Sequence, residues 1–238
     1  MIVSIKKCIF GYRKYNRMIS LSEENYLKAI FHLETTFKKG VSTNALAEEM
    51  ETKASSVTDM VKRLSEKKLV NYKKYQGVKL SPKGRATAVE IIRKHRLWEC
   101  FLVEKLNFNW DEVHEVAEQL EHVKSEKLTR EIDRFLGFPK TDPHGDPIPD
   151  VEGNFIKTSR ALLMECDEGE TAVIVGVKDS STAFLRFLDK NNLKLGSKMK
   201  LVHKEDFDDS VLVETETGEL HLSKKIAANL FIRLTNES

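Results

Sequence analysis

This chain of 238 residues has no long hydrophobic run and no paired cysteines, and its few prolines are not spread evenly. No segment approaches the roughly 20 consecutive apolar residues that a membrane-spanning helix needs, and Lys6 and Lys7 interrupt the short apolar start, so we expect neither a membrane protein nor a secretory signal. The three cysteines, Cys8, Cys100 and Cys166, are scattered, which argues against a disulfide framework and against a zinc knuckle. We therefore expect a protein of the reducing cytoplasm.

The small net charge of +2 conceals two oppositely charged parts of the chain. Residues 1–100 carry 21 Lys and Arg against 10 Asp and Glu, whereas residues 101–238 carry 18 against 27. A basic half joined to an acidic half is typical of a nucleic-acid-binding domain attached to a domain with another task. Lysines that only keep the surface solvated are the alternative explanation.

The basic part has the pattern of a DNA-binding domain. Apolar residues recur with helical spacing in three short segments between residues 22 and 64, of which the first begins at Ser22 and ends before Gly40. Residues 69–80 then alternate like two short strands around a turn. Two short helices with a tight turn, followed by a strand pair, predict a winged helix-turn-helix over residues 21–90.

The rest of the chain divides at a cluster of prolines. Helical patterns predict a long helix over residues 85–105, another over 111–127 and a shorter one that ends at Phe135. Four of the five prolines then gather between residues 139 and 149, which predicts a loop or linker. Beyond residue 159, short β-like runs separated by glycines, with one helix among them, predict a small barrel.

Two of the predicted helices in the middle of the chain carry histidines and glutamates at helical spacing. If residues 111–127 form one helix, four of these side chains share a face, and a pair four residues apart on the preceding helix could meet them. Imidazoles and carboxylates without a thiolate are typical of Mn²⁺ or Fe²⁺ sites. The alternative is a solvated face of glutamates with incidental histidines. The six candidates are His95, Glu99, His114, Glu118, Glu121 and His122.

From about residue 21 to residue 234 the chain resembles the diphtheria-toxin-repressor/MntR family of metal-dependent regulators. The segments that carry the resemblance are Glu24 to Ile30, Ala54 to Leu64, Arg93 to Leu97 with Glu99, Glu121 to Val123, and the loop Pro143 to Pro149. The resemblance implies a mainly α fold with a small β domain. The implied parts are a basic N-terminal extension (1–20), the winged helix-turn-helix (21–90), a helical dimerisation and metal-binding domain (91–140), a proline-rich linker (141–158) and an SH3-like, FeoA-type barrel (159–238).

The same resemblance implies two neighbouring metal positions. His95, Glu99 and His114 would hold one, while Glu118, Glu121 and His122 would hold the other together with Asn25 from the first helix. Glu118 stands where iron-type members have cysteine, and a hard carboxylate favours Mn²⁺ over Fe²⁺ as the cofactor. The SH3-like domain of some relatives adds a ligand, for which Asp179 is the candidate in this chain.

The function that the resemblance implies is that of a homodimeric repressor, which binds a palindromic operator of metal-uptake genes when Mn²⁺ is present. The cation would tie the first helix to the dimerisation helices and so fix the spacing of the two recognition helices. Short hydroxyls and lysines are suited to phosphate and base-edge contacts, although Ser55 could instead cap its helix. The candidate DNA contacts are Lys53, Ser55, Ser56, Thr58, Asp59, Lys62, Lys73 and Lys74.

Three alternatives stay open at this point. The first is an Fe²⁺-dependent repressor of iron uptake with the same architecture. The second is a di-iron enzyme, which the absence of a repeated Glu-x-x-His pattern disfavours, so we expect no enzyme. The third is a DNA-binding protein that needs no metal. Residues 1–17 precede the resemblance and have two interpretations, a basic arm on DNA or a segment upstream of a start at Met18.

Overall fold

The computed structural model describes residues 19–73 and 76–235, and the chain divides into two compact units after Ile92. The expected basic arm (1–17) and Lys74 lie outside the described residues. No helix in the described part of the chain is long and apolar enough to cross a membrane.

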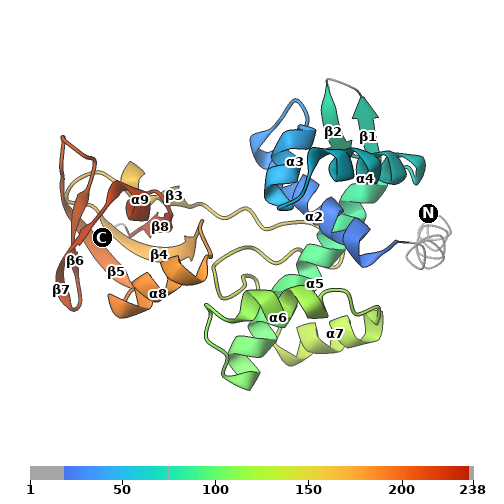
Figure 1. The fold of residues 1–238 in the computed structure, drawn as a ribbon. Helices are drawn as coiled ribbons and strands as arrows, with labels where there is room; N and C mark the ends of the chain where they lie inside the picture. Colours follow the sequence, from blue (N-terminus) through green and yellow to red (C-terminus); the bar gives the residue numbers. More distant parts are fainter. Residues whose placement is uncertain (1–18, 74–75, 236–238) are drawn as a thin grey trace. The chain divides into compact units, whose positions relative to one another are not determined.

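The first unit is the predicted winged helix-turn-helix (Figure 1). Its first helix begins at Leu21, one residue before the expected Ser22, because Ser20 forms a capping box. The Ser20 hydroxyl accepts the Glu23 N–H, and the Ser20 N–H donates to the Glu23 carboxylate. The elements are α2 (Leu21–Thr36), α3 (Thr43–Glu49), α4 (Ala54–Glu66), β1 (Val70–Lys73), β2 (Gly77–Leu80) and the first part of α5 (Pro82–Leu106).

The wing is tied closely to the turn between α2 and α3. Val41 and Val78 form a bridge in which each N–H donates to the other's carbonyl, at 2.9 and 2.8 Å. Gly77 has φ +80°, and a Cβ there would lie 2.8 Å from the Val41 carbonyl oxygen, so no other residue fits without a shift of the backbone. The core beneath contains Leu27, Ile30, Leu46, Val61 and Leu64, all fully buried.

The helical part of the second unit consists of the remainder of α5, then α6 (Val113–Leu120) and α7 (Glu126–Phe135). The expected single helix over residues 111–127 is wrong, since α6 ends at Leu120 and a short turn follows. The physical reason lies at Ser125, whose hydroxyl accepts the Leu128 N–H and thereby starts α7 as a separate helix.

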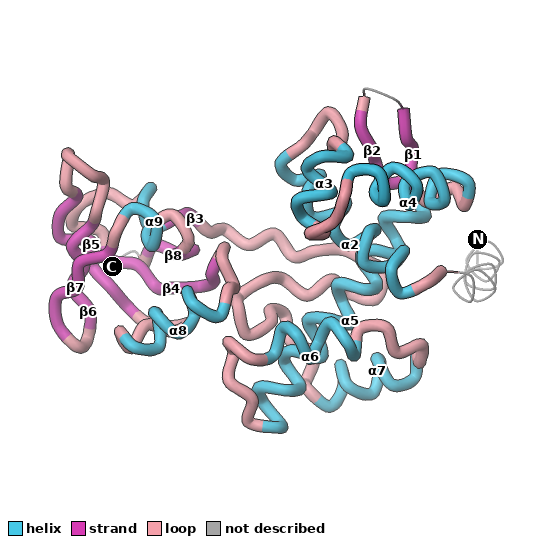
Figure 2. The backbone as a smooth tube through the Cα atoms, in the orientation of Figure 1, coloured by secondary structure: helices cyan, strands magenta, loops and turns pink. Residues whose placement is uncertain are grey.

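The proline-rich segment contains no helix or strand but is held by specific hydrogen bonds. Figure 2 shows the chain between α7 and β3 as loop. Residues 140–148 form a narrow hairpin, in which Ile148 N–H donates to the Lys140 carbonyl at 2.9 Å and Asp142 N–H to the Asp146 carbonyl at 3.0 Å. Three arginines hold this part of the chain through its carbonyls and carboxylates: Arg93, Arg96 and Arg160.

The C-terminal part is a six-stranded antiparallel sheet with strand order β3-β8-β4-β5-β6-β7. Irregularities at Ile174/Gly176 and at Leu201/His203 interrupt the register and bend the strands. The elements are β3 (Ala161–Leu162), the 3-10 helix η2 (Leu163–Glu165), β4 (Thr171–Val177), α8 (Thr182–Lys190), β5 (Lys198–Lys204), β6 (Val211–Thr215), β7 (Gly218–Leu222), α9 (Lys224–Ala227) and β8 (Leu230–Leu234).

Candidate metal centre and nucleic-acid interface

Helix α5 places His95 and Glu99 on one face, one turn apart. Both side chains are buried, and His95 Nε2 lies 3.0 Å from Glu99 Oε1. The other ring nitrogen of His95, Nδ1, lies 2.6 Å from Oε2 of Glu121, which is fully buried in the turn after α6. His95 therefore sits between two carboxylates that come from different elements.

Glu99 is the point at which the imidazoles converge. Its Oε1 lies 3.0 Å from His95 Nε2, 3.5 Å from His114 Nδ1 and 3.7 Å from His144 Nδ1. Burial would raise the pKa of Glu99, but hydrogen bonds with His114, His144 and His95 outweigh it and hold the pKa well below its ordinary value. This carboxylate is therefore ionised, and it faces one imidazole nitrogen from each of the three histidines.

His144 was not among the candidates that the sequence suggested. It comes from the hairpin at residues 140–148 and is only 5% exposed. Its Nε2 lies 2.8 Å from the carbonyl oxygen of Trp110. Because a carbonyl can only accept, Nε2 carries the hydrogen of this bond, and Nδ1 is the nitrogen left to face Glu99. A backbone carbonyl that orients one ring nitrogen in this way is usual behind a metal-binding histidine.

Asp142 is the second residue that the sequence analysis missed. Its Oδ1 accepts the N–H groups of His144 and Asp146, both at 2.9 Å, and its Oδ2 lies 3.3 Å from Arg96 Nε. Burial and the nearby Glu99 charge raise the pKa of Asp142 to about 7, against the effect of Arg96. Burial lowers the pKa of His144, but its hydrogen bond with Glu99 and the Glu99 charge raise it to about 9.

Two groups of three side chains have ligand atoms close enough for a cation among the described residues. We call His95, Glu99 and His114 the helix site, and Glu99, Asp142 and His144 the loop site. They share Glu99. The helix site contains the three residues expected for one metal position, with His114 about half exposed and the other two buried.

The residues expected at the other position are distributed differently. Glu118, about half exposed, lies 3.7 Å from His114 Nε2, while Glu121 Oε1 lies 3.8 Å from His122 Nε2. The expected single helical stripe of four ligands is therefore wrong, because Glu121 and His122 leave the helix in the turn after Leu120. Asp179 is in neither group of the described residues, and its Oδ1 accepts the Ser181 N–H.

The chemistry of these side chains fits a divalent cation. Imidazole nitrogens and carboxylate oxygens are ligands of Mn²⁺ and Fe²⁺. The nearest thiol in sequence, Cys100, does not compete, because burial raises its pKa and its Sγ lies 3.6 Å from the Thr141 carbonyl. In the first unit, Asn25 Oδ1 is the one buried side-chain oxygen or nitrogen of the described residues that has no hydrogen-bond partner, as expected of a ligand atom.

Helix α4 of the first unit offers a polar face. Val57, Val61 and Leu64 are buried on one side. The N-cap residue is Lys53, so Ser55 does not cap this helix, and the Thr58 hydroxyl donates to the Ala54 carbonyl at 2.9 Å. The expected DNA contacts that are described and exposed are Lys53, Ser55, Ser56, Asp59, Lys62 and Lys73, with Thr58 partly buried.

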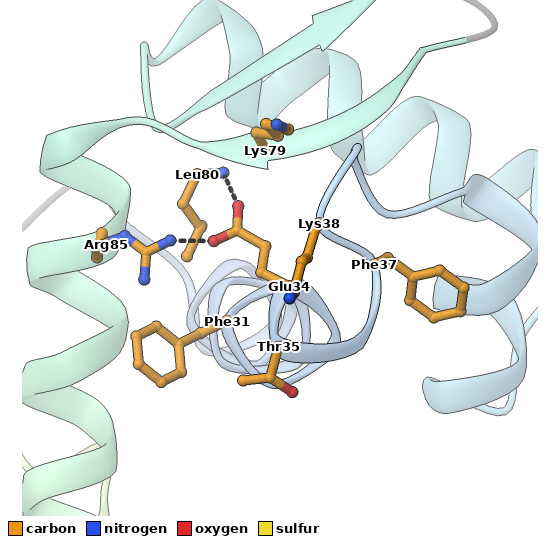
Figure 3. A pocket seen from close by; sticks show the side chains of 8 residues that line it. All are labelled: Phe31, Glu34, Thr35, Phe37, Lys38, Lys79, Leu80 and Arg85. Atoms are coloured by element: carbon orange, nitrogen blue, oxygen red, sulfur yellow. Dashed lines mark hydrogen bonds and ion pairs between the residues drawn. The ribbon is translucent and has the colours of Figure 1, made fainter. Parts of the chain in front are cut away.

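Besides the bridge between Val41 and Val78, a carboxylate from α2 contacts the wing. Figure 3 shows Glu34 between the Leu80 amide of β2 and the guanidinium of Arg85 at the start of α5. The Leu80 N–H donates to Glu34 Oε1 at 2.7 Å. The shallow pocket around this contact measures about 370 Å³ and is lined by Phe31, Glu34, Thr35, Phe37, Lys38, Lys79, Leu80 and Arg85. None of these lining residues is a candidate metal ligand, and Glu34 among them holds the wing through Leu80 and Arg85.

An exposed apolar surface lies on α5 and α7. Phe135 is 65% exposed, and its ring lies 6.3 Å from that of Phe101, which in turn contacts Trp98 edge to face at 5.8 Å. Phe138 and Leu128 are exposed nearby in the sequence. Aromatic side chains in an exposed apolar group are typical of a protein interface.

Three family models match successive parts of the chain. Residues 18–78 match the N-terminal DNA binding domain of iron dependent repressors, residues 81–150 their metal binding and dimerisation domain, and residues 161–234 the FeoA domain. The iron-dependent repressor IdeR of Mycobacterium leprae is 38% identical over 128 residues, which are 53% of this chain and 54% of that protein. The diphtheria toxin repressor of Corynebacterium diphtheriae is 31% identical over 59% of this chain and 62% of its own length. The chain thus spans about half the length of these curated relatives.

Solved structures match over most of the chain. A manganese-dependent transcriptional repressor in complex with manganese has a TM-score of 0.79 and 33% identity, covering 90% of this chain and all of that one. The manganese regulator SloR has a TM-score of 0.73 and 32% identity over 90% of this chain and 98% of its own. The IdeR of T. acidophilum, at 26% identity, has a TM-score of 0.72 over 92% of this chain and all of that one. Because the two models of iron dependent repressor domains together match more than half of the chain, the chain belongs to the diphtheria-toxin-repressor/MntR family.

Proposed function

We propose that this protein is a metal-dependent transcriptional repressor that binds operator DNA as a homodimer when Mn²⁺ is bound. The observation that carries the proposal is the set of buried imidazoles and carboxylates around Glu99. Buried charges are costly unless they are paired or bind a cation, and His95 together with Glu99 and Glu121 places two buried carboxylates on one ring.

The proposed ligands form two positions. The first position combines the helix site and the loop site, which share Glu99. Its ligands would be His95, Glu99 and His114 together with Asp142 and His144. For the second position we keep the four residues that the sequence suggested, of which Asn25 brings an otherwise unsatisfied oxygen. A bound divalent cation supplies positive charge that holds ligands from separate segments together. The residues proposed for the second position are Asn25, Glu118, Glu121 and His122.

Mn²⁺ is the proposed cation, and Fe²⁺ is the second candidate. The ligand set has oxygen and nitrogen atoms and no thiolate, which suits hard cations. The relatives divide between the two metals, since solved structures of manganese-responsive regulators match this chain as well as iron-dependent repressors at up to 38% identity. Operator binding titrated with Mn²⁺ and with Fe²⁺ under anaerobic conditions separates the two.

The remaining surfaces fit a regulator of transcription better than an enzyme. The exposed hydroxyls and lysines of α4 suit phosphate and base-edge contacts. The apolar face around Phe101 and Phe135 suits a second copy of the chain. In this proposal the cation is an effector and no group acts as a catalyst.

The test is a fluorescence-anisotropy titration with labelled DNA from upstream of the protein's own gene. Wild-type protein should bind with Mn²⁺ and release the DNA when the metal is chelated. Glu121→Ala and His122→Ala should remain folded and lose at least about tenfold of the Mn²⁺-dependent affinity, since a ligand is removed. Glu115→Ala, an exposed change on α6, is the matched control and should behave as wild type. Equal DNA binding by wild-type protein with and without chelator would end the proposal.

A further inference from the structure

The connection between β5 and β6 presents a bare aromatic ring to solvent. Phe207 is 98% exposed, more than any other large hydrophobic side chain in the described part of the protein. Val202, on the adjoining strand β5, is 39% exposed. A single exposed apolar side chain is common in proteins, so its surroundings decide whether it has a role.

The turn that carries this ring is held by its own hydrogen bonds. The Glu205 N–H donates to the Ser210 carbonyl, and the Asp209 N–H donates to the Glu205 carbonyl, both at 2.9 Å. The Asp208 carboxylate accepts the Ser210 N–H at 2.9 Å, and Lys224 of α9 donates to the Asp209 carboxylate at 2.6 Å. The ring therefore projects from an ordered backbone, which lowers the entropy lost when it binds a partner.

The ring stands between acidic side chains. Asp206 and Asp208 precede and follow Phe207, and both are exposed. Lys224 pairs with Asp209 and leaves the charges of the other two aspartates facing solvent. Such a surface repels DNA phosphates and anionic lipids. It favours a partner surface with an apolar centre and a basic rim.

The pocket in Figure 3, which we call the wing pocket, has this chemistry. The rings of Phe31 and Phe37 lie on either side of it, and its cations are Lys38, Lys79 and Arg85. An enclosed cavity of about 150 Å³ is large enough to bind benzene. With a volume of about 370 Å³, the wing pocket has room for one phenyl ring.

The charge of the wing pocket is positive and available. Its one acidic lining residue, Glu34, already accepts the Leu80 N–H and pairs with Arg85. Lys38 and Lys79 are exposed and form no ion pair with any described residue. None of the lining residues comes from α4 or is among the proposed DNA contacts, so the proposed binding of DNA makes no use of this pocket.

We propose that the wing pocket of one copy of this protein binds the Phe207 turn of a second copy, so that repressor dimers on neighbouring DNA sites contact one another. The ring packs against the two phenylalanines of the pocket, and the aspartates beside it meet Lys38 and Lys79. Because the two surfaces differ, the contact does not close on itself, and each dimer can contact the next. The inference rests on the proposed function, since it acts between dimers bound to operator DNA.

The size of the contact explains why DNA is required. Stable protein interfaces bury about 1,200–2,000 Å², far more than one ring and its charged neighbours provide. We therefore expect Phe207→Ala to remain a dimer in solution like wild type. On DNA, two dimers held close together have a high effective concentration, and a weak contact becomes sufficient. Full burial of a phenylalanine ring corresponds to about 10- to 100-fold in an equilibrium constant, which is the cooperativity expected here.

The first test is photocrosslinking of the full-length protein, with p-benzoylphenylalanine in place of Phe207. Unlabelled and ¹⁵N-labelled dimers are mixed immediately before irradiation, with and without DNA. We expect cross-links from position 207 to residues 31–38 or 79–85, and pairs of one labelled and one unlabelled peptide among them. Cross-links only within one chain, or none to the pocket lining, would overturn the proposal.

The second test compares DNA that carries one copy of the protein's own upstream sequence with DNA that carries two copies at several spacings over one helical turn. Phe207→Ala should bind the single copy like wild type and lose about tenfold or more of the cooperativity on the double copy. Asp206→Lys and Lys79→Glu should each lose cooperativity, and the double variant should regain it because the charges are exchanged. Glu216→Lys, at the exposed turn between β6 and β7, is the matched control and should behave as wild type.

The two tests separate failure of this inference from failure of the proposed function. If wild-type protein with Mn²⁺ binds neither DNA, the proposed function fails, and the cross-links obtained without DNA decide whether the two surfaces meet. If wild type binds single copies without cooperativity at every spacing, the function stands and the contact between dimers is overturned. Cooperativity that survives both Phe207→Ala and Lys79→Glu would overturn it as well.

Discussion

His144 holds a proton where the loop site would hold a cation. Its pKa of about 9 means that at pH 7.5 the metal-free ring carries hydrogen on both nitrogens, so Nδ1 must release one before it can bind metal. We expect Mn²⁺ binding at pH 7.5 to release about one proton at this site and its affinity to rise as pH increases toward 9. Calorimetry in two buffers with different ionisation enthalpies measures this release. Identical heats in both buffers would contradict it, and His144→Ala should lose the release.

The pH dependence of folding stability follows from the raised pKa values of His144 and Asp142. A raised His144 pKa stabilises the metal-free fold below about pH 6.5, and this stability is lost as pH rises through about 9. Asp142 also has a raised pKa, which makes its buried carboxyl most favourable when protonated, and its contribution falls as pH rises toward about 7. Both groups therefore favour the metal-free fold at lower pH, and metal binding opposes that trend.

The sequence suggested all three residues of the helix site but only Glu99 of the loop site. His95 and Glu99 stand at i, i+4 on a long helix, and this spacing is visible without a structure. Asp142 and His144 lie in a hairpin whose prolines and glycine have no period, so nothing in the chain shows which way their side chains turn. The signal that was available is a histidine with two aspartates within five residues of the loop, since imidazoles and carboxylates are common metal ligands.

At the level of elements, periodic segments were predicted well and boundaries set by caps less so. The strand pair of the wing, the helix α8 and the longer strands of the sheet coincide with the patterns of alternating and helical apolar residues. The helix after Asp111 was predicted too long, because the apolar spacing continues past Leu120 while the cap at Ser125 starts a new helix. The short β3 and α9 had too few residues to show any period.

The wing should depend on Glu34 of α2. Replacing it by Ala leaves the Leu80 N–H without its acceptor and Arg85 without its partner, which should lower the free energy of unfolding by about 1–3 kcal/mol. Denaturant unfolding measures the loss, and hydrogen exchange should speed up at the Leu80 amide. Glu48→Ala, on the exposed side of α3, is the control and should change stability by less than about 0.5 kcal/mol. Equal stability of both variants would show that the wing does not need this carboxylate.

Helix α7 should carry part of the dimer contact. Phe135 is large, apolar and mostly exposed, so Phe135→Asp should bury a charge in the interface and weaken dimerisation about 30-fold or more. Analytical ultracentrifugation across a concentration series measures the shift. Phe207→Asp is the matched control, because Phe207 is 98% exposed in the connection between β5 and β6. Dissociation by the control with no effect of Phe135→Asp would place the interface on the sheet domain.

At the scale of the whole molecule, the basic and acidic parts of the chain divide the work. In the proposed function the first unit would supply lysines for DNA, and the second would supply the carboxylates that attract a cation. Under the proposed function the two events must be coupled through the protein, since the proposed DNA contacts and the proposed metal ligands are different residues. Coupling is a free energy shared between two binding steps, and it can be measured from either end.

That reciprocity gives the strictest prediction for the proposed function. If Mn²⁺ tightens operator binding by some factor, operator DNA must tighten Mn²⁺ binding by the same factor, and allosteric couplings usually correspond to about 5- to 150-fold. DNA affinity measured with saturating Mn²⁺ and with chelator gives one value, and Mn²⁺ affinity measured with and without excess operator gives the other. The salt concentration must be identical in both, because contacts with phosphates make DNA affinity fall steeply with salt. Values that differ by more than experimental error would show a third linked equilibrium, such as dimerisation, and a factor of one from both ends would mean that the cation is structural and not a signal.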